Sequence, residues 1–317
     1  MKKHALLDPS LVTDNLGDFI ILDAVGQILR ELFPQDYFCH IPTNDEMGRE
    51  ALRQLKDCEM SFVGGTNLLS SHWWWYRQWN LRPFEVFMVK DAVLLGVGWH
   101  KYQSKPDFLT GWVYRKMLSR TTKHSVRDRY TQAHLASVGI DNVINTGCPT
   151  MWRLTPEHCR QIPVKKAKAA IVTLTSYLPR PDVDRAWIEV VFDHYDEVYF
   201  WSQTYDDHAY AMSLFKDRIK LVPPSLEGYD EALKTLDCDH IGTRLHGGIR
   251  ALQHKRRALI LEVDNRAAEI GRDTRLHSAP RTEPAAIAEW IARPRSLELR
   301  MPFENIEQWK RQFRSTP

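Results

Sequence analysis

Short apolar runs alternate with amphipathic stretches along the whole chain, and this alternation constrains the fold more than any single motif does. A strand buried in a parallel sheet shows as a short apolar run, while the helix that connects it to the next strand shows one apolar face. The chain is therefore predicted to adopt an α/β fold with mainly parallel sheets. Strands are expected near residues 4–7, 36–40, 59–63, 92–97, 123–127, 142–145, 169–174, 197–201, 218–222, 238–242 and 257–262.

The clearest predicted helix covers Asp18 to Leu32, where apolar side chains recur at helical spacing. We expect this helix to pack on the first sheet, because one of its faces is continuously apolar. Further helices are expected near residues 183–194, 206–216, 227–236, 245–253, 283–293 and 303–314.

A chain of 317 residues fits two domains better than one, and 43% hydrophobic residues suffice for two cores. Three prolines between residues 149 and 163 precede a basic run, so the interdomain connection is expected there. We predict a first domain over residues 1–155, a second over 165–300, and a tail over 301–317 that packs back on the first. The two domains should face each other across a cleft, with ligands beyond the carboxyl ends of the strands.

Composition excludes several classes of protein. The net charge of +3, from 43 basic and 40 acidic residues, is too balanced for a chain whose main work is to bind nucleic acid. The five cysteines are scattered without CxxC spacing, so we expect neither a disulfide framework nor a zinc site. Cys238-Asp239-His240 looks like a metal triplet, but alternation along a strand would turn Asp239 away from its neighbours. No metal is therefore expected.

The sequence also bears on location in the cell. No apolar run approaches the ~20 residues of a membrane span, and Asp8 and Asp14 interrupt any signal-peptide core, so we expect a cytoplasmic protein. The basic run His254-Lys255-Arg256-Arg257 is typical of a solvated surface, and contact with an anionic lipid or a diphosphate is the alternative. Peripheral contact with the inner face of the membrane therefore stays open.

The stretch from Gly242 to Leu252 places a fixed cation and a titratable imidazole where a strand becomes a helix. Arg244 and His246 fall near the start of that helix, where free N–H groups and the positive end of the dipole attract phosphate or carboxylate. The segment therefore suits anion binding and proton transfer. The alternative is an ordinary helix start with an exposed arginine and a capping histidine.

Two further turns follow predicted strands. In Asn15-Leu16-Gly17-Asp18, Asp18 either caps the next helix or acts on an acceptor hydroxyl. Gly64-Gly65-Thr66-Asn67 allows a ligand or the opposite backbone to approach closely, and turn chemistry alone is the alternative. Neither this turn nor Gly96-Val97-Gly98 matches the dinucleotide fingerprint or the P-loop, so no NAD or ATP cofactor is expected.

Arg127 ends a predicted strand and either pairs with Asp128 or points toward a ligand. Beside Arg244 from the other domain, Arg127 could share one anion that carries both a carboxylate and a phosphate.

Five aromatic residues gather between Trp73 and Trp79, and flat exposed rings suit sugars. A core plug or a membrane contact is the alternative for this cluster.

The order of five segments resembles the polysaccharide pyruvyl transferase family, over about residues 12 to 265. The segments are Asn15-Leu16-Gly17-Asp18, Gly64-Gly65, Val126-Arg127-Asp128 with Leu135 and Gly139, Gly147-Cys148-Pro149-Thr150, and Gly242-Thr243-Arg244-Leu245-His246-Gly247. The resemblance implies two Rossmann-like domains of the GT-B type. It also implies transfer of the pyruvyl group of phosphoenolpyruvate (PEP) onto two hydroxyls of a sugar, as a cyclic ketal.

The resemblance further implies roles for particular residues. His246 would be the catalytic acid beside Arg244, and PEP would be the donor substrate with no separate cofactor. The position of Asp18 in the turn before the first helix separately predicts that it assists catalysis as a base toward the acceptor hydroxyl. The donor site would contain Arg127, Arg244, Leu245, His246 and Gly247. Beyond the resemblance, the two turns and the tryptophan cluster predict that the acceptor, a saccharide or a lipid-linked saccharide, contacts Asn15, Gly17, Asp18, Gly65, Thr66, Asn67 and Trp74.

Positions 65 and 66 carry Gly-Thr where Gly-Gly is commoner, and the tryptophan-rich stretch is a second departure, so the acceptor stays undetermined. Two other functions remain open. A GT-B glycosyltransferase could bind a nucleotide sugar through Glu262 and Asp264, and a non-catalytic glycan-binding protein could use the tryptophan cluster. The oligomeric state, the general base and the ketal stereochemistry are not determined by the sequence.

Overall fold

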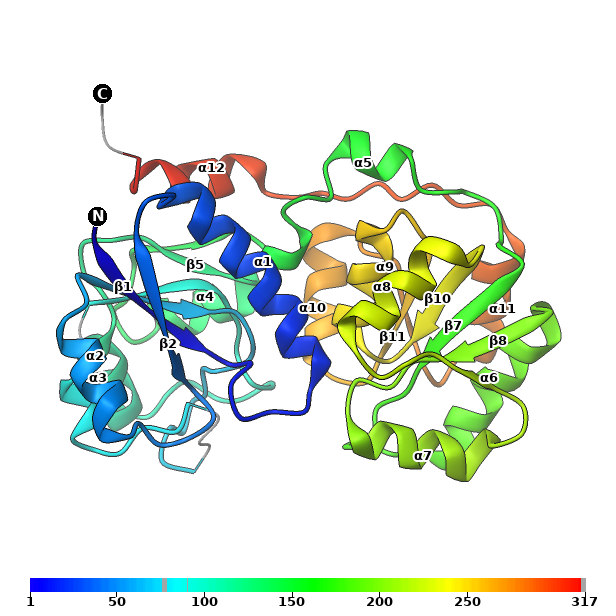
Figure 1. The fold of residues 1–317 in the computed structure, drawn as a ribbon, viewed down its shortest axis with the longest axis horizontal. Coiled ribbons are helices and arrows are strands. Elements are labelled where there is room, and N and C mark those ends of the chain that lie inside the picture. Colours follow the sequence, from blue (N-terminus) through cyan, green and yellow to red (C-terminus); the bar gives the residue numbers. More distant parts are fainter. Residues whose placement is uncertain (76–78, 90, 315–317) are drawn as a thin grey trace. The chain divides into compact units, whose positions relative to one another are not determined.

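The computed structural model describes residues 1–75, 79–89 and 91–314 (Figure 1). It divides into two compact units. The first comprises Met1–Thr13, Ile21–Trp152 and Met301–Pro317, and the second comprises Asp14–Ile20 and Arg153–Arg300. The chain passes between the units at residues 13–14, 20–21, 152–153 and 300–301, and the third of these crossings lies in the proline-containing region that the sequence singled out.

The first unit is built on one parallel sheet, which has six strands within the described residues, in the order β2-β1-β3-β4-β5-β6. These strands are β1 (Lys3–Asp8), β2 (Tyr37–Pro42), β3 (Met60–Gly64), β4 (Ala92–Val97), β5 (His124–Val126) and β6 (Val143–Asn145). The chain goes from β1 outward to β2 and then returns to the other side of β1 with β3. In such sheets, the carboxyl ends of the strands are the usual place for ligands.

Helices cover both faces of this first sheet. Buried side chains of α2, α3 and α4 pack with Leu7, Val63 and Leu94 of the strands. On the other face, Phe33 at the end of α1 and Phe313 after α12 both contact the ring of Phe62. The helices are α1 (Leu16–Leu32), α2 (Arg49–Lys56), α3 (Phe108–Met117), α4 (Arg129–Ala136) and α12 (Phe303–Arg311), with short 3-10 turns η1 (Glu85–Phe87) and η2 (Pro149–Met151).

The second unit contains the other parallel sheet, in which six described strands follow the order β12-β11-β10-β7-β8-β9. Here the order of the strands along the chain reverses between β7 and β10, which are parallel, hydrogen-bonded neighbours. The strands are β7 (Ala169–Thr173), β8 (Glu197–Phe200), β9 (Lys220–Leu221), β10 (Cys238–Gly242), β11 (Ala258–Glu262) and β12 (Ser278–Pro280).

Helices also cover both faces of the second sheet. Trp187, Phe215 and Trp290 belong to one core cluster with Val172 and Ile241, whereas Tyr229 and Gly248 approach His240 on the other face. The helices are α5 (Pro156–Arg160), α6 (Pro181–His194), α7 (Tyr205–Phe215), α8 (Leu226–Thr235), α9 (Leu245–Gln253), α10 (Asn265–Thr274) and α11 (Pro284–Ala292). None of the described helices is long and apolar enough to cross a bilayer.

The predicted α/β class with two parallel sheets is confirmed, and every expected strand is present. The sequence missed β12, which is short and ends in Pro280, and it missed α10, whose segment is mostly polar. The expected strand near 218–222 shrinks to Lys220–Leu221, because Pro223 follows closely and both strand residues are exposed at the sheet edge. Helix α12 belongs to the first unit and contacts β5 and β6.

One segment departs from the predicted domain boundaries. Residues 14–20 group with the second unit, although the sequence placed all of 1–155 in the first. The Leu16 amide donates to the Gln203 carbonyl at 2.9 Å, and the Asp14 carboxylate accepts from the Tyr205 amide at 3.1 Å. These bonds satisfy backbone donors at the first turns of α1 and α7, which have no partner within their own helices.

Candidate active site

In the second unit, β7 and β10 are neighbours where the strand order reverses, and this brings two threonine-rich strand ends together. Gly242 has no room for a side chain, since a Cβ there would lie 2.5 Å from the Thr173 carbonyl oxygen. The hydroxyl of Thr243 donates to that of Thr175 at 2.8 Å, and the Arg244 amide lies 3.3 Å from the Thr173 hydroxyl. The two strand ends are thus held tightly where ligands bind in open parallel sheets.

Arg244 is buried at this strand end and is already paired. Its Nε donates to Asp207 Oδ2 at 2.8 Å, and its Nη2 donates to Asp207 Oδ1 at 2.5 Å. Nε also lies 3.2 Å from the Leu174 carbonyl, and the guanidinium stands 5.2 Å from the ring centre of Tyr177. The Nη1 atom of Arg244 takes part in none of these hydrogen bonds. An anion would therefore meet an arginine whose charge is largely balanced by Asp207.

His246 is the second residue of α9 and is buried, with a relative exposure of 6%. The helix start rests on Tyr229, whose hydroxyl donates to the Gly247 carbonyl at 2.9 Å and contacts His240 Nδ1 at 2.9 Å. The Tyr229 ring in turn stacks on Trp201 at 3.9 Å. The imidazole of His246 is thus placed at a helix N-terminus by a rigid, buried aromatic support.

Next to this strand end is a cluster of charged and hydroxyl groups, of which the sequence analysis named only Asp264. Tyr177 donates from its hydroxyl to Asp264 at 2.9 Å, and Arg266 pairs with Asp264 at 2.6 Å. Burial acts to lower the pKa of Arg266, but the charge of Asp264 outweighs it and holds that pKa above its usual range. Asp18 contributes a weaker attraction of the same sign.

Residues 15–18 belong to the second unit rather than the first. Asn15 Nδ2 donates to Asp18 Oδ2 at 3.0 Å, and Asn15 Oδ1 accepts from the Gly17 amide at 3.1 Å. A Cβ on Gly17 would come within 3.1 Å of Gln203 Oε1. The carboxylate of Asp18 is buried in the first turn of α1 and belongs to the same unit as His246.

In the first unit, the predicted glycine turns lie at the carboxyl ends of β3 and β4. Gly65 and Thr66 both have a positive φ, at 57° and 55°, a backbone conformation that glycine adopts without strain and threonine does not. The Gly98 amide donates to the Thr66 carbonyl at 2.8 Å, so the two turns are bonded to each other. Gly96 approaches Pro149, with a would-be Cβ only 2.0 Å from its Cδ.

Arg127 lies next to these turns and is 2% exposed. Its Nε stands 3.4 Å from Asp128 Oδ2, so the predicted ion pair with Asp128 forms. Asp128 also caps α4 through a 2.7 Å hydrogen bond from the Thr131 amide. A Cβ on Gly98 would lie 2.2 Å from Arg127 Nη2. That nitrogen is buried and has no hydrogen-bond partner among the described residues.

Four buried polar atoms without a described partner lie just after parallel strands. They are Asn67 Oδ1 and Arg127 Nη2 in the first unit, and Gln203 Nε2 and Asn265 Oδ1 in the second. A buried polar group without a partner costs stability, so its persistence calls for an explanation such as a ligand or a water molecule. Within each unit, these atoms fall at the edge of the sheet where ligands are expected.

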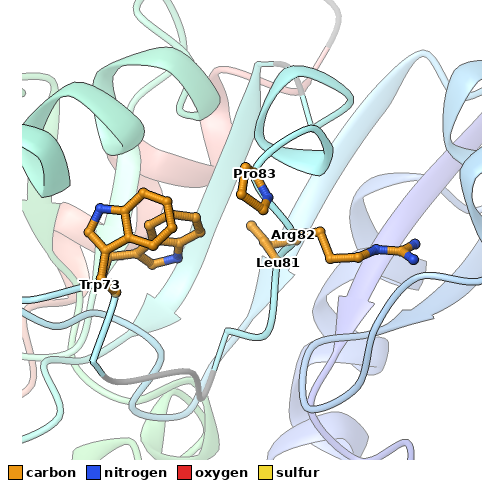
Figure 2. Close-up of a pocket in the computed structure, with 5 residues that line it drawn as sticks. Trp73, Leu81, Arg82 and Pro83 are labelled. Atoms are coloured by element: carbon orange, nitrogen blue, oxygen red, sulfur yellow. The ribbon is translucent and has the colours of Figure 1, made fainter.

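The tryptophan cluster separates into buried and exposed members. Trp73 and Trp79 are buried, whereas Trp74 is 40% and Trp75 is 90% exposed, and Tyr76 lies outside the described residues. Trp73 and Trp74 line a small cavity of ≈ 70 Å³ with Leu81, Arg82 and Pro83. Figure 2 shows the Trp73 indole facing Leu81 and Pro83, with the Arg82 side chain directed away from it.

Two sequence interpretations concerned residues near β10. Asp239 accepts from Tyr195 at 2.6 Å, whereas His240 faces Tyr229, so strand alternation does separate the would-be metal triplet. No group of metal-ligating side chains is found among the residues that the structure describes.

The basic run after α9 is not a freely solvated surface, because Arg257 is buried and pairs with Asp239 at 3.3 Å. The sequence could not show this, since the partner is on the neighbouring strand.

Sequence reasoning missed Asp207, Tyr177 and Arg266. Asp207 lies in the first turn of α7, where an acidic residue is ordinary, so nothing in the pattern marked it as the partner of Arg244. Asp264 was noted as a possible nucleotide contact, and the structure uses it to cap α10 and to bind Arg266.

Two six-stranded parallel sheets with helices on both faces, within the described residues, define a GT-B-like α/β protein. The chain belongs to the polysaccharide pyruvyl transferase family, whose model matches residues 15–265. The family is one of transferases, so the protein is an enzyme of that general kind. A search of curated proteins gave no significant match.

Solved structures resemble this chain in fold. The UDP-GlcNAc 2-epimerase of Methanocaldococcus jannaschii, in complex with UDP-GlcNAc and UDP, has a TM-score of 0.57 at 11% identity, with 98% of each chain covered. The MnaA–UDP co-structure from S. aureus has a TM-score of 0.55 at 12% identity, covering 94% of this chain and 93% of that chain. At such low identity, the likeness concerns the fold alone.

Proposed function

We propose that this enzyme transfers the pyruvyl group of PEP to two hydroxyls of one sugar, with His246 as the general acid. Membership of the pyruvyl transferase family supports the transferred group, and the buried imidazole at the start of α9 supports the acid. The single observation that carries the proposal is this placement of His246 beside Arg244, at the point where the strand order of the second sheet reverses.

The reaction balances without a redox step. His246 would give a proton to the methylene carbon of PEP, which becomes a methyl group, and C2 becomes an oxocarbenium-like centre. One sugar hydroxyl adds to C2 and releases its proton, and a second hydroxyl then displaces phosphate and releases its own. One proton returns to the acid and one goes to the departing phosphate, so the products are the ketal and inorganic phosphate.

The donor carries a carboxylate and a phosphate, which need cationic partners. Arg127 offers a buried Nη2 without a described partner, whereas Arg244 is already balanced by Asp207. We propose Arg127 and Arg244 as donor contacts, together with Leu245 and Gly247 at the start of α9. The sharing of one anion by the two arginines stays a prediction from the sequence.

The acceptor contacts are proposed on local grounds. Asn67 has a buried Oδ1 without a described partner and follows Thr66, whose positive φ strains the backbone, which suits a site that takes a sugar hydroxyl. Asp18 is buried in the same unit as His246 and is proposed to relay the proton of an attacking hydroxyl. A saccharide or lipid-linked saccharide is the proposed acceptor, and the cytoplasm is the proposed location.

Phosphate release from PEP tests the function. The purified enzyme is mixed with PEP and a panel of galactose, mannose, glucose and N-acetylhexosamine acceptors, and phosphate is measured together with the mass of the sugar product. We expect phosphate to appear with an acceptor that gains the mass of a pyruvyl ketal. UDP and GDP sugars serve as the comparison. Release of a nucleotide diphosphate from them, without any reaction of PEP, would favour a glycosyltransferase instead.

Thermal shift measures donor binding separately from turnover. A ligand that binds the folded state alone raises the melting temperature, so PEP should stabilise the protein and UDP sugars should not. Binding of glycans with no phosphate release on any acceptor would point to the non-catalytic alternative.

A further inference from the structure

The outward face of α3 is unusually apolar for a helix of the first unit. Its exposed residues are Phe108, Leu109, Trp112 and Lys116, which fall on one side of the helix, while Val113 and Met117 pack into the core. Phe108 is 84% exposed. A helix on a globular protein normally presents its polar side to water. This helix presents three large apolar side chains and one cation.

The apolar face continues onto the 3-10 turn η1. Phe84 and Phe87 are about half exposed, and the Phe87 ring lies 5.9 Å from that of Trp112. We call Phe84, Phe87, Phe108, Leu109 and Trp112 the aromatic surface. Trp74 and Trp75, which follow Trp73, are also exposed, and the Trp73 amide bonds to Thr110 of α3 at 3.0 Å. Exposed apolar residues in such number are a mark of an interaction site.

Cations border the aromatic surface. The Arg82 guanidinium lies 4.7 Å from the ring centre of Phe84, and Lys116 Nζ lies 5.8 Å from that of Phe87. The loop that leads into α3 adds Lys101 and Lys105.

Two nearby carboxylates offset the charge of Arg82, so Lys116, with Lys101 and Lys105 in the preceding loop, supplies the positive charge at this border. Glu85 is fully buried and bonds to Arg82, and Glu46 lies 3.5 Å from Arg82 Nη1. Asp107 caps α3 through the Thr110 amide and pairs with His72 at 3.1 Å. The sequence of α3 itself contains no acidic residue.

We propose that the aromatic surface docks on an anionic lipid bilayer. Phenylalanine and tryptophan rings insert at the boundary between headgroups and acyl chains, and lysines at the rim attract anionic headgroups. Lysine rather than arginine supplies the charge around this surface, and lysine is depleted at protein interfaces relative to the rest of the surface, so a bilayer fits better than a protein partner. The basic run after α9, which the sequence suggested for such contact, has its arginines bound to carbonyls and to Asp239.

Vesicle sedimentation tests the proposal without any substrate. The full chain is spun with vesicles of phosphatidylcholine alone or with about 30% phosphatidylglycerol, at low and high salt. We expect binding to the anionic vesicles that is weakened by salt, and a blue shift of tryptophan fluorescence on binding. The double variant Phe108→Ser/Trp112→Ser should bind at least about tenfold more weakly. Lys116→Gln should weaken binding roughly fivefold on anionic vesicles and little on neutral ones.

The matched control is Tyr205→Ser/Leu221→Ser, which removes two exposed apolar side chains from the second unit. Tyr205 and Leu221 are 78% and 50% exposed, so the control changes do not disturb a core. The control should bind vesicles as the unchanged protein does. Equal binding by the α3 double variant, or no binding by the unchanged protein, would overturn the proposal. So would a dimer in light scattering that the α3 variant dissociates, since the surface would then join two copies of the chain.

Turnover with a water-soluble acceptor separates this proposal from the proposed function. The α3 variant should keep that turnover, because its changed residues are outside the strand ends that hold the candidate site.

Discussion

Two buried arginines at strand ends differ in how their charges are satisfied. Arg244 gives two of its guanidinium nitrogens to one carboxylate, Asp207, with N–O distances of 2.5 and 2.8 Å. Arg127 has a single longer contact of 3.4 Å with Asp128, and its Nη2 is buried without a partner among the described residues. A buried charge without a partner gains more from a bound anion than a paired one does. Arg127 should therefore gain more from the bound donor than Arg244 does.

Gly98→Ala tests the role of Arg127 without changing it. The added Cβ would stand 2.2 Å from Nη2 and 2.4 Å from Cζ of Arg127, so the guanidinium must move. We expect the KM for PEP to rise roughly 10- to 100-fold, the scale of one hydrogen bond to a charged group. Gly48→Ala is the control, because nothing lies within 4 Å of a Cβ at that position. Unchanged PEP kinetics in Gly98→Ala would remove Arg127 from the donor site.

His246→Ala should lose a factor of about 10² to 10⁴ in kcat, the usual scale for general acid catalysis. The imidazole is buried at the start of α9, so His246→Gln is made in parallel to keep a side chain of similar length there. Phosphate release measures kcat, and PEP-induced thermal shift checks that the donor still binds. Turnover near that of the unchanged enzyme in either variant would exclude His246 as the acid.

At the level of elements, the site of the second unit depends on how closely β10 lies to β7. The strands are hydrogen-bonded in register from Cys238 opposite Ala169 to Gly242 opposite Thr173. Gly242 ends β10 and Gly247 lies in the first turn of α9, so two glycines flank Arg244 and His246. Their surroundings differ sharply, which allows the strand end and the helix start to be tested separately.

Gly242→Ala should destabilise the protein by about 1–3 kcal/mol, because a Cβ there meets three atoms of Thr173 within 2.6 Å, two of them backbone. Gly247→Ala should be neutral or stabilising by up to ~1 kcal/mol, since its nearest neighbours stand at 3.4 Å and alanine favours a helix. Urea unfolding gives both values. Equal stability of the two variants would contradict the tight packing of β10 on Thr173.

The apolar periodicity of the sequence predicts some of the helices and strands and not others. Apolar runs predicted β1 to β11 and most of the helices of the second unit, because burial on both faces of a parallel sheet leaves a clear imprint. The polar segment that forms α10 carries no such imprint, and its start is set by Asp264 accepting from the Arg266 amide at 2.9 Å. Short or polar elements are decided by capping and by neighbours, which periodicity does not report.

At the level of the whole molecule, each unit contains a buried neutral histidine in its sheet. Burial lowers the pKa of His124 in β5 to about 4 and that of His240 in β10 to about 3. His124 uses both ring nitrogens, with Nδ1 3.2 Å from the Leu94 amide and Nε2 2.8 Å from the Ser119 carbonyl. A proton on either imidazole therefore favours the unfolded chain.

Acid should consequently weaken both units. The unfolded chain takes up a proton on each histidine below its ordinary pKa of about 6.5, whereas the folded chain does not until about pH 4 for His124 and about pH 3 for His240. The free energy of unfolding should fall by up to about 1.4 kcal/mol per pH unit and per histidine as the pH drops through this window.

Urea unfolding at pH 7.5, 6.5, 5.5 and 4.5 measures the slope. His240→Gln and His124→Gln should each reduce the slope, whatever they do to stability at pH 7.5. Slopes that match the unchanged protein would mean that these histidines are protonated in the folded state.

By itself, the sequence determined the α/β class, the two parallel sheets and the turns that carry the candidate residues, because these follow from local patterns of apolar spacing and glycine. Tertiary structure decided which charges meet. Asp207 on α7 pairs with Arg244, and the buried Arg257 pairs with Asp239. Residues 14–20 join the second unit through hydrogen bonds to Gln203 and Tyr205. These partners are far apart along the chain, and the energy of their pairing depends on distance and burial, which no local pattern encodes.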